Sequence, residues 1–255
     1  MPDYRRIVPC LDMKDGRVVK GVHFVNLRDA GDPVEAGRAY SEAGADEIAF
    51  LDISATVEGR GTMLDVLRKT AQAVTAPLVV GGGIRGVEDA QKLLDIGVSA
   101  VSVNTAVVRN PGLVRDLAEK FTPARLIVAI DVRRSEQMES GYEVVTRGGT
   151  QPEGMDAIAW GQRVRDLGAG QILPTSMDTD GTQAGYDNTL NRLLAEATGL
   201  PIIASGGAGR LEHFYDAIVE GKADAVLAAS VFHFGEIGIR EVKEYLRDRG
   251  IPVRL

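Results

Sequence analysis

Cysteine is almost absent from this chain. Cys10 is the one thiol among 255 residues, so no disulfide can form within the chain, which fits a reducing compartment. We expect Cys10 to fill space in the core of the first strand. Runs of 18 apolar residues are absent, which argues against a transmembrane helix, and the N-terminal segment MPDYRRIVPCLD lacks the apolar stretch of a signal peptide. These absences predict a cytoplasmic protein that does not use a membrane.

Motifs for metals and nucleotides are lacking too. The three histidines, His23, His213 and His233, have no HxxxH spacing, and GxGxxG does not occur. We therefore predict no metal site and no cofactor, and we expect His213 and His233 to be helix or loop residues near apolar partners. A net charge of −7 argues against nucleic acid as the main partner.

Eight short apolar runs recur along the chain, each followed by aspartate, glycine or a small polar residue. Such runs, alternating with helical stretches, are typical of parallel strands buried on both faces. Eight units in about 250 residues match a (β/α)8 barrel. No linker divides the chain, so we predict one α/β domain over residues 1–255, a (β/α)8 TIM barrel. The runs are RRIVPCLD, EIAFLDIS, PLVVGGG, AVSVNT, LIVAID, QILPTSMD, PIIASGG and AVLAAS.

The second half of the chain repeats landmarks of the first at a nearly constant offset. This pattern predicts two half-barrels of four βα units each, and a substrate with two similar ends would suit them. The paired landmarks are Asp12 with Asp131, Asp52 with Asp178, Gly82 with Gly206 and Thr105 with Ser230, separated by 119, 126, 124 and 125 residues.

Two of these aspartates, Asp12 and Asp131, end the first and fifth runs. Chemistry in this fold sits at the C-terminal ends of the strands, and we expect the two carboxylates to face each other there. Such a pair suits general acid and base roles if its surroundings separate the pKa values. A capping role is the less favoured alternative, because charge inside an apolar run is costly. For Asp52 and Asp178, orienting roles such as holding Lys20 or a loop are about as well supported as binding of the substrate.

Glycine clusters at 81–83 and 206–209 follow the third and seventh runs. Glycine lets backbone N–H groups approach an anion closely, and the next helix N-terminus adds a positive dipole end. Asn104 and Thr105 in the first half, and Ser230 in the second, supply nearby polar donors. One cluster alone would also fit a tight turn, but two at matching positions predict a site for a bisphosphate.

Loops complete the predicted site. The segment 14–35 is cationic and rich in glycine, which suggests a mobile lid over an anion, with a plain surface loop as the alternative. The helix after it should begin at Asp32 and Pro33, an aspartate N-cap followed by proline. The segment YEVVTRGGT has the alternating polar and apolar character of a strand, which predicts a small hairpin. In DTDGT, Asp180 and Gly181 are expected to shape a ligand-binding turn.

These motifs together strongly resemble the cyclase subunit of imidazole glycerol phosphate synthase, over essentially the whole chain. The resemblance implies a lyase-type ring closure in histidine biosynthesis. Ammonia and a bisphosphorylated ribulosyl-formimino aminoimidazole carboxamide ribotide would give imidazole glycerol phosphate and aminoimidazole carboxamide ribotide. The motifs are CLDMKDGRVVKGVHFVNLRDAGDPVE, ADEIAFLDISAT, VGGGIR, VSVNTAVV, VAIDVRR, TSMDTDGTQAGYD, PIIASGGAGRLEHF and LAASVFHFGEI.

The resemblance also implies roles for single residues. Asp12 and Asp131 match the acid–base pair, and Lys20 matches a loop lysine that covers the substrate. The other matches are two phosphate sites: Gly83, Asn104 and Thr105 for one, and Gly181, Gly207 and Ser230, with Asp180 near the glycerol end, for the other.

A glutaminase partner is implied as well, docked at the N-terminal face and delivering ammonia through the barrel. The family shows a ring of Arg, Glu, Lys and Glu at that entrance. Arg6 and Glu47 match two members and would pair alone, because Ala100 and Gln171 stand at the other two positions. Ser99 replaces an acidic residue usual at the partner interface. These departures predict altered gating and partner coupling.

Two more departures lie in and after the sixth run. Pro174 stands at a position that is usually apolar and not proline, and Thr179 replaces an arginine. Proline cannot donate a ladder hydrogen bond, so its cost depends on whether that N–H would be bonded.

Two other functions compete with the cyclase. The sibling sugar isomerase of the same pathway shares the half-barrel repeat, the bisphosphate site and the paired aspartates. The opening VPCLDMKDGRVVKGVHFVNL and the VFHFG ending resemble the cyclase instead. A barrel scaffold or binding module with weakened catalysis is the third possibility, against which the presence of both Asp12 and Asp131 argues.

Overall fold

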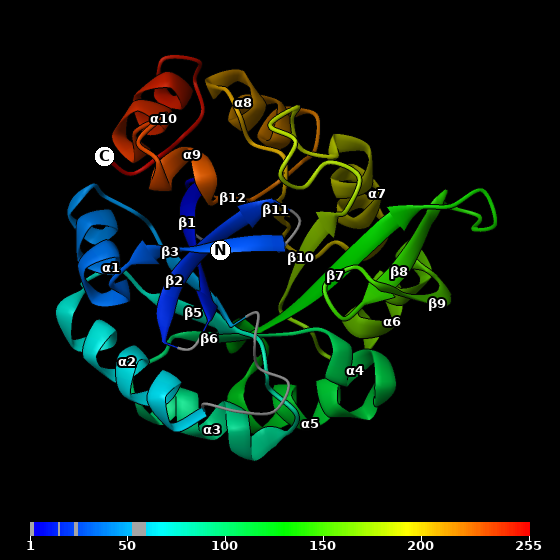
Figure 1. Cartoon of the computed structure of the whole chain (residues 1–255). Helices are drawn as coiled ribbons and strands as arrows, with labels where there is room; N and C mark the ends of the chain where they lie inside the picture. The colour runs from blue at the N-terminus through cyan, green and yellow to red at the C-terminus, as the bar shows by residue number, and fades with distance from the viewer. Residues whose placement is uncertain (1–2, 15, 23–24, 53–59) are drawn as a thin grey trace. The chain divides into compact units, whose positions relative to one another are not determined.

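Eight parallel strands joined by helices form a closed (β/α)8 barrel in the computed structural model, which describes residues 3–14, 16–22, 25–52 and 60–255 (Figure 1). The barrel strands follow the order β10-β11-β12-β1-β4-β5-β6-β7, and β10 also pairs with β7, which closes the ring. The predicted fold class is confirmed.

All eight predicted runs contain a barrel strand. Hydrophobic side chains of these strands are buried, for example Ile7 and Leu11 in β1 and Ile48 in β4, each 0% exposed. The strands are β1 (Arg6–Lys14), β2 (Arg17–Val22), β3 (Val25–Gly31), β4 (Ile48–Asp52), β5 (Leu78–Gly81), β6 (Ala100–Val103), β7 (Leu126–Arg134), β8 (Tyr142–Thr146), β9 (Gln151–Asp156), β10 (Gln171–Ser176), β11 (Ile203–Ser205) and β12 (Ala225–Ala228).

Helices follow the barrel strands, as the alternating pattern predicts. They are α1 (Pro33–Glu42), α2 (Arg60–Ala73), α3 (Val87–Asp95), α4 (Thr105–Arg109), α5 (Gly112–Phe121), the 3-10 helix η1 (Pro123–Arg125), α6 (Ala157–Asp166), α7 (Asn188–Thr198), α8 (Leu211–Val219), α9 (Ser230–His233) and α10 (Ile239–Arg247).

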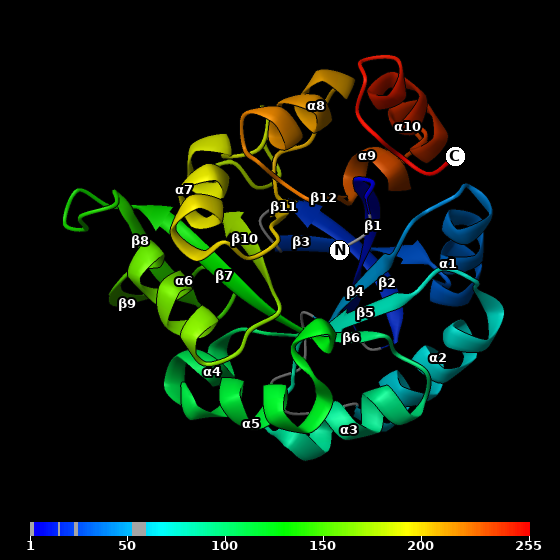
Figure 2. The same ribbon diagram turned by 180° about the vertical axis from the view of Figure 1, so that it is seen from behind.

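The chain divides into two compact units, one made of residues 1–101 and 227–255, the other of residues 102–226. The division points fall inside β6 and β12 and lie 125 residues apart, within the range of spacings between the repeated landmarks. In the first unit the two ends of the chain meet: the N–H of Arg5 donates to the carbonyl of Pro252 at 2.8 Å, and α10 packs on β1 (Figure 2).

The segment after β1 differs from the predicted loop. It holds β2, which pairs antiparallel with β1, and β3, which pairs antiparallel with β2. Pairing satisfies the backbone groups that an irregular loop would leave to water. The side chain of Lys20 lies outside the part that the structure describes, so its role stays a prediction. The start of α1 is confirmed: Asp32 accepts from the N–H groups of Val34 and Glu35, and proline occupies the first turn.

The predicted hairpin is present after β7. β8 pairs antiparallel with both β7 and β9, and the turn contains Arg147, Gly148 and Gly149, all with positive φ. A Cβ at Gly149 would lie 2.3 Å from the sulfur of Met177. Glycine is therefore needed where this turn rests on the loop after β10.

Pro174 lies inside β10, where the pairing of β10 with β11 is interrupted. The N–H of Ile172 donates to Pro201 and that of Met177 to Val132, so the nitrogen at position 174 faces β11. The β7–β10 register is continuous from Gln171 to Ser176. The β10–β11 side has one pair, Thr175 with Ser205, and an isolated bridge at Ile172. Proline thus removes a donor that would face β11.

We expect Pro174→Val to extend the β10–β11 ladder. A new backbone hydrogen bond contributes about 1 kcal/mol, offset in part because proline restricts the unfolded chain. The free energy of unfolding should rise by roughly 0.5 kcal/mol, and hydrogen exchange should show a protected amide at position 174. An unprotected amide there would mean that the interruption has another cause.

A buried ion cluster joins the chain ends in the first unit. Lys243 on α10 is 2% exposed, and its Nζ donates to the carbonyl of Gly44 at 2.6 Å, to the carbonyl of Arg254 at 2.7 Å and to Asp46 at 3.0 Å. The other oxygen of Asp46 accepts from the N–H of Ile7 at 2.8 Å. Every donor of the ammonium is used, so the cluster holds the C-terminal segment against β1 and the loop before β4.

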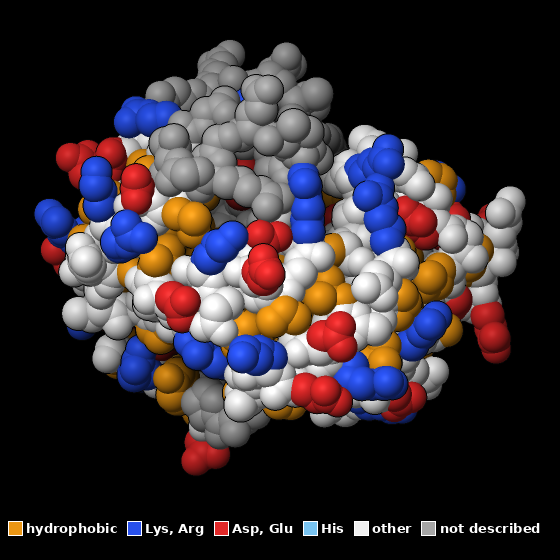
Figure 3. Space-filling model, turned by 90° about the horizontal axis from the view of Figure 1, so that it is seen from below, with side chains coloured by type: hydrophobic (Ala, Val, Ile, Leu, Met, Phe, Trp, Pro, Cys, Tyr) orange, Lys and Arg blue, Asp and Glu red, His pale blue; other side chains and the backbone are white. Residues whose placement is uncertain are grey.

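The surface view in Figure 3 shows acidic and basic side chains interspersed, with hydrophobic ones between them. None of the helices in the described part of the chain is both long and apolar enough to cross a membrane.

Candidate functional site

Asp131 lies in β7, next to two other polar side chains of the second unit. Its register partners are Thr175 in β10 and Val145 in β8. The Nδ2 of Asn104 donates to Oδ2 of Asp131 at 2.9 Å. Asn104 follows β6, so the ends of β6 and β7 bring together an amide and a carboxylate that are 27 residues apart.

Burial raises the pKa of Asp131 to about 7. The negative charge of Asp180 adds to this increase, while the hydrogen bond from Asn104 opposes it. A carboxyl group with this pKa is protonated in about half of the molecules at neutral pH. It can therefore give or take a proton near neutral pH.

The structure assigns Asn104 a contact that the sequence did not predict. The sequence placed Asn104 and Thr105 at a phosphate, whereas the amide of Asn104 is used by Asp131. Its Oδ1 is buried and has no hydrogen-bond partner among the described residues. The Thr105 hydroxyl accepts weakly from the N–H of Arg147, at 3.4 Å. The sequence signal for the contact between Asn104 and Asp131 was that the two residues belong to consecutive apolar runs, which form adjacent strands.

The glycine cluster after β11 interlocks with the loop after β10. Gly206 and Gly207 have positive φ, and a Cβ on Gly207 would lie 2.1 Å from the carbonyl of Gly185. A Cβ on Gly206 would lie 3.2 Å from Oδ1 of Asp180. Glycine is required here by close approach. Asp180 thus lies beside this cluster, and its charge also acts on Asp131. Gly181, with φ +74°, belongs to the same turn as Asp180.

Asp178 orients main chain, because it contacts the last residue of β7. Its Oδ2 accepts from the N–H of Arg134 at 2.8 Å. Sequence reasoning missed its neighbour Asp187, a buried N-cap of α7 that accepts from Tyr142 at 2.8 Å and from Arg134 at 3.2 Å. Thr179 makes local turn bonds to the carbonyl of Ser176.

In the first unit, Asp12 lies above a buried thiol. The Sγ of Cys10 is 3.8 Å from Oδ1 of Asp12, and Cys10 is 1% exposed, as predicted for a core residue. The hydroxyl of Tyr40 is buried without a partner among the described residues. Burial, followed by Cys10 and Asp12, raises the pKa of Tyr40 above its ordinary value.

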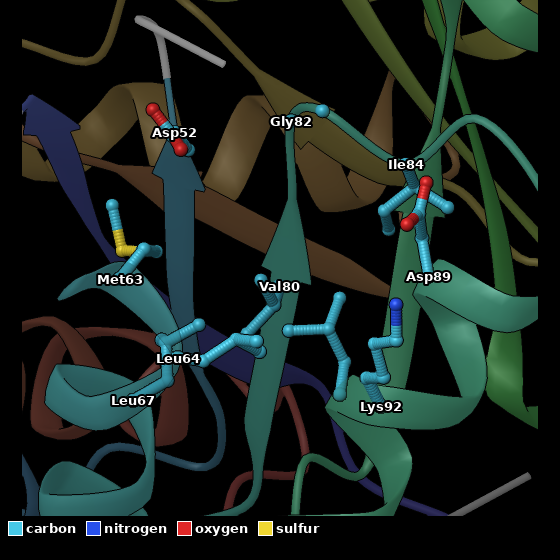
Figure 4. A pocket seen from close by; sticks show the side chains of 11 residues that line it. Asp52, Met63, Leu64, Leu67, Val80, Gly82, Ile84, Asp89 and Lys92 are labelled. Atoms are coloured by element: carbon cyan, nitrogen blue, oxygen red, sulfur yellow. The ribbon is translucent and has the colours of Figure 1, made fainter. Parts of the chain in front are cut away.

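A cavity of about 120 Å³ lies beside the ends of β4 and β5 in the same unit. Figure 4 shows Asp52 and Gly82 at its upper rim, with Leu64 and Val80 below them. Gly83 also lines it. A Cβ on Gly82 would lie 2.1 Å from the carbonyl of Asp52, so the two strand ends are in close backbone contact.

Ser230 starts the short helix α9 in this unit. Among the described residues, no group of three or more His, Cys, Asp or Glu side chains is placed to hold a metal ion. His233 ends α9 with its ring edge-to-face against Phe234, at 5.4 Å between centroids, which is the apolar neighbour predicted for it.

Residues 6–238 match the family model described as histidine biosynthesis protein. The chain belongs to this family. The family includes both the cyclase and its sibling isomerase, so the match establishes an enzyme of histidine biosynthesis of one of these two types.

In this family member an ion pair lies at the N-terminal strand ends of the first unit. The Nη1 of Arg6 is 2.5 Å from Oε1 of Glu47, so these two members of the expected ring pair with each other. Ala100 is 7% exposed at the start of β6, and the N–H of Ser99 donates to Leu78 at 2.8 Å. Gln171, in the second unit, starts β10.

Proposed function

We propose that this protein is the cyclase subunit of imidazole glycerol phosphate synthase; Asp131 carries the acid–base chemistry of the proposal, and the sequence motifs carry the choice of the cyclase. A carboxyl with a pKa of about 7, in the C-terminal half of barrel strand β7, fits a general acid for ring closure on a phosphorylated substrate. The opening VPCLDMKDGRVVKGVHFVNL and the ending VFHFG favour the cyclase over the isomerase.

Proton transfer needs two partners. Ammonia addition and ring closure require groups to be protonated and deprotonated in turn, so a neutral acid and an ionised base serve better than two like groups. We assign Asp131 as the acid and Asp12 as the base. Cys10 donates to Asp12, which helps to orient that carboxylate.

Backbone donors at glycine loops would hold the two phosphates. Gly207 and its neighbours in the second unit, and Gly83 in the first, follow β11 and β5, and each loop precedes a helix whose N-terminus favours an anion. Thr105 and Ser230 each start a helix of their own. Lys20 is proposed to cover the bound substrate.

The decisive assay supplies each candidate substrate in turn. With ammonium salt, the bisphosphorylated ribulosyl substrate should give imidazole glycerol phosphate and aminoimidazole carboxamide ribotide. If the protein isomerises the preceding sugar substrate and forms no ammonia-dependent product, it is the isomerase and not the cyclase. If it converts neither substrate, the barrel scaffold or binding module is favoured.

We further propose a glutaminase partner whose coupling is weak. Arg6 and Glu47 pair with each other, whereas Ala100 and Gln171 supply no charge where the family has a lysine and a glutamate. An incomplete charged ring would constrict the ammonia entrance less and depend less on the partner's state. Rim charges mainly affect association and partner choice.

We expect restoration of the ring, by Ala100→Lys together with Gln171→Glu, to raise glutamine-dependent turnover in the presence of a glutaminase subunit. Turnover with ammonium salt should change little, since free ammonia does not need coupling. The measurement is the ratio of glutamine-dependent to ammonium-dependent rate for parent and double variant. Full coupling in the parent, unchanged by restoration, would show that this ring is dispensable.

A further inference from the structure

His213 lies on the first turn of α8, directly behind the glycine loop 206–209. Its side chain is buried, at 5% exposed. The backbone N–H of Gly209 is 3.1 Å from Nδ1, and the guanidinium of Arg210 lies 3.3 Å from Nε2. The sequence predicted a helix or loop residue near apolar partners; the helix is confirmed, and the ring nitrogens contact two polar groups that the sequence did not predict.

The ring also meets the second loop of the same site. A Cβ on Gly185 would lie 3.6 Å from Cδ2 of His213, and a Cβ on Gly209 would lie 2.3 Å from the carbonyl of Gln183. The N–H of Gly185 in turn donates to the carbonyl of Gly207 at 2.8 Å. The imidazole therefore fills the place where loops 178–187 and 206–209 interlock.

A neutral ring suits these neighbours better than an imidazolium. A neutral imidazole has one acceptor nitrogen and an imidazolium has none, so the neutral ring can accept from the Gly209 N–H at Nδ1. Its Nε2 then carries the hydrogen, and the guanidinium of Arg210 at 3.3 Å is a neighbouring positive charge that also disfavours the imidazolium. Burial first, and then the charge of Arg210, lower the pKa of His213, and Asp216 and Glu212 oppose this. Gly185 meets the ring through a backbone that carries no charge.

We propose that His213 is a positioning residue for the anion site at loop 206–209: its neutral ring holds the Gly209 amide, and protonation of the ring releases the loop. This deepens the proposed function, because it rests on that loop binding a substrate phosphate. Backbone donors bind an anion well only when their directions are set in advance. An imidazolium would leave the Gly209 N–H without its acceptor, and the loop would bind the anion more weakly.

Two variants separate the acceptor from the proton. His213→Asn keeps an oxygen near the position of Nδ1 but cannot become charged, whereas His213→Phe keeps bulk and loses the acceptor. Sulfate is the probe, because its charge is constant between pH 5.5 and 8. Its affinity would be read from the backbone amide shifts of Gly207, Ala208 and Gly209 by NMR, together with kcat and KM for the substrate. Thermal unfolding of each variant checks its fold.

For the parent we expect sulfate affinity to fall as the pH drops below the ordinary histidine pKa of about 6.5. His213→Asn should match the parent within twofold at pH 7.5 and lose this pH dependence. His213→Phe should raise the sulfate Kd and the KM by about three- to tenfold, as for one lost hydrogen bond, with kcat nearly unchanged. His233→Asn, which removes an imidazole elsewhere, should retain the parent's pH dependence.

The outcomes distinguish the two proposals. Sulfate that shifts these amides with the same pH dependence in parent and His213→Asn would overturn the role of His213 and leave the phosphate site standing. An unchanged affinity in a folded His213→Phe would do the same. Sulfate that does not shift the loop amides of the parent at pH 7.5 would overturn both.

Discussion

Replacement of Asp131 by asparagine should remove most turnover with ammonium salt while leaving substrate affinity nearly unchanged. General acid–base catalysis typically contributes 10² to 10⁴-fold, and we expect a loss of about that size for Asp131→Asn and for Asp12→Asn. Asparagine has the same shape but cannot exchange a proton. Steady-state kcat and the substrate Kd are the measurements. If both variants retain kcat within a few-fold of the parent, the acid–base assignment is wrong.

The same replacement should stabilise the folded protein. Because the pKa of Asp131 rises from 3.8 to about 7 on folding, its contribution to stability is fully present below about pH 4 and lost as the pH rises through 7. Asparagine does not ionise, so Asp131→Asn avoids this loss of stability at higher pH. The gain in free energy of unfolding should therefore grow between pH 4 and 7, to a few kcal/mol at most. Asp116→Asn, at an exposed carboxylate on α5, is the matched control and should change little.

The neighbours of Asp131 offer a test of sign as well as size. Asp180→Asn removes a like charge and should lower the pKa of Asp131, whereas Asn104→Ala removes the amide donor and should raise it. The pH dependence of kcat/KM should shift in opposite directions in the two variants. This comparison does not depend on how far either change lowers the rate. Shifts in the same direction would contradict the arrangement around Asp131.

The second large effect is expected at Lys243. Lys243→Met should lower the free energy of unfolding by about 3–5 kcal/mol, because it leaves the carboxylate of Asp46 buried without its ammonium partner. Asp46 is entirely buried, and the more distant Arg254, at 3.4 Å, is partly exposed. Urea unfolding monitored by circular dichroism measures the change.

Lys222→Met is the matched control for this prediction. Lys222 pairs with Glu196 at 2.7 Å, but both side chains are about half exposed. Surface pairs of this kind contribute about 0–1 kcal/mol, so the same chemical change should cost little. Equal losses in the two variants would show that burial of the Lys243 cluster is not the source of its effect.

Local patterns predicted most of the fold. The strands at Ile48 and Leu126, the hairpin that begins at Tyr142 and the helix start at Asp32 all follow from signals within a few residues of sequence. Apolar runs, alternation and an aspartate before proline act over that range. The sequence pattern does not predict strands β2 and β3: charged residues and glycine favour a loop there, and the pairing of β2 with β1 depends on a neighbour already in place.

Part of the residue chemistry of the site was also visible in the sequence, including the carboxylate of Asp131 in a buried strand and the need for glycine at 206 and 207. What only the tertiary structure decided is which groups meet. Burial raises the pKa of Asp131, and two distant residues modify it: Asp180, 49 residues away in sequence, raises it further, and Asn104, 27 residues away, lowers it. The reason is physical: a pKa depends on the loss of water and on charges a few ångströms away. Neither quantity exists until the chain has folded.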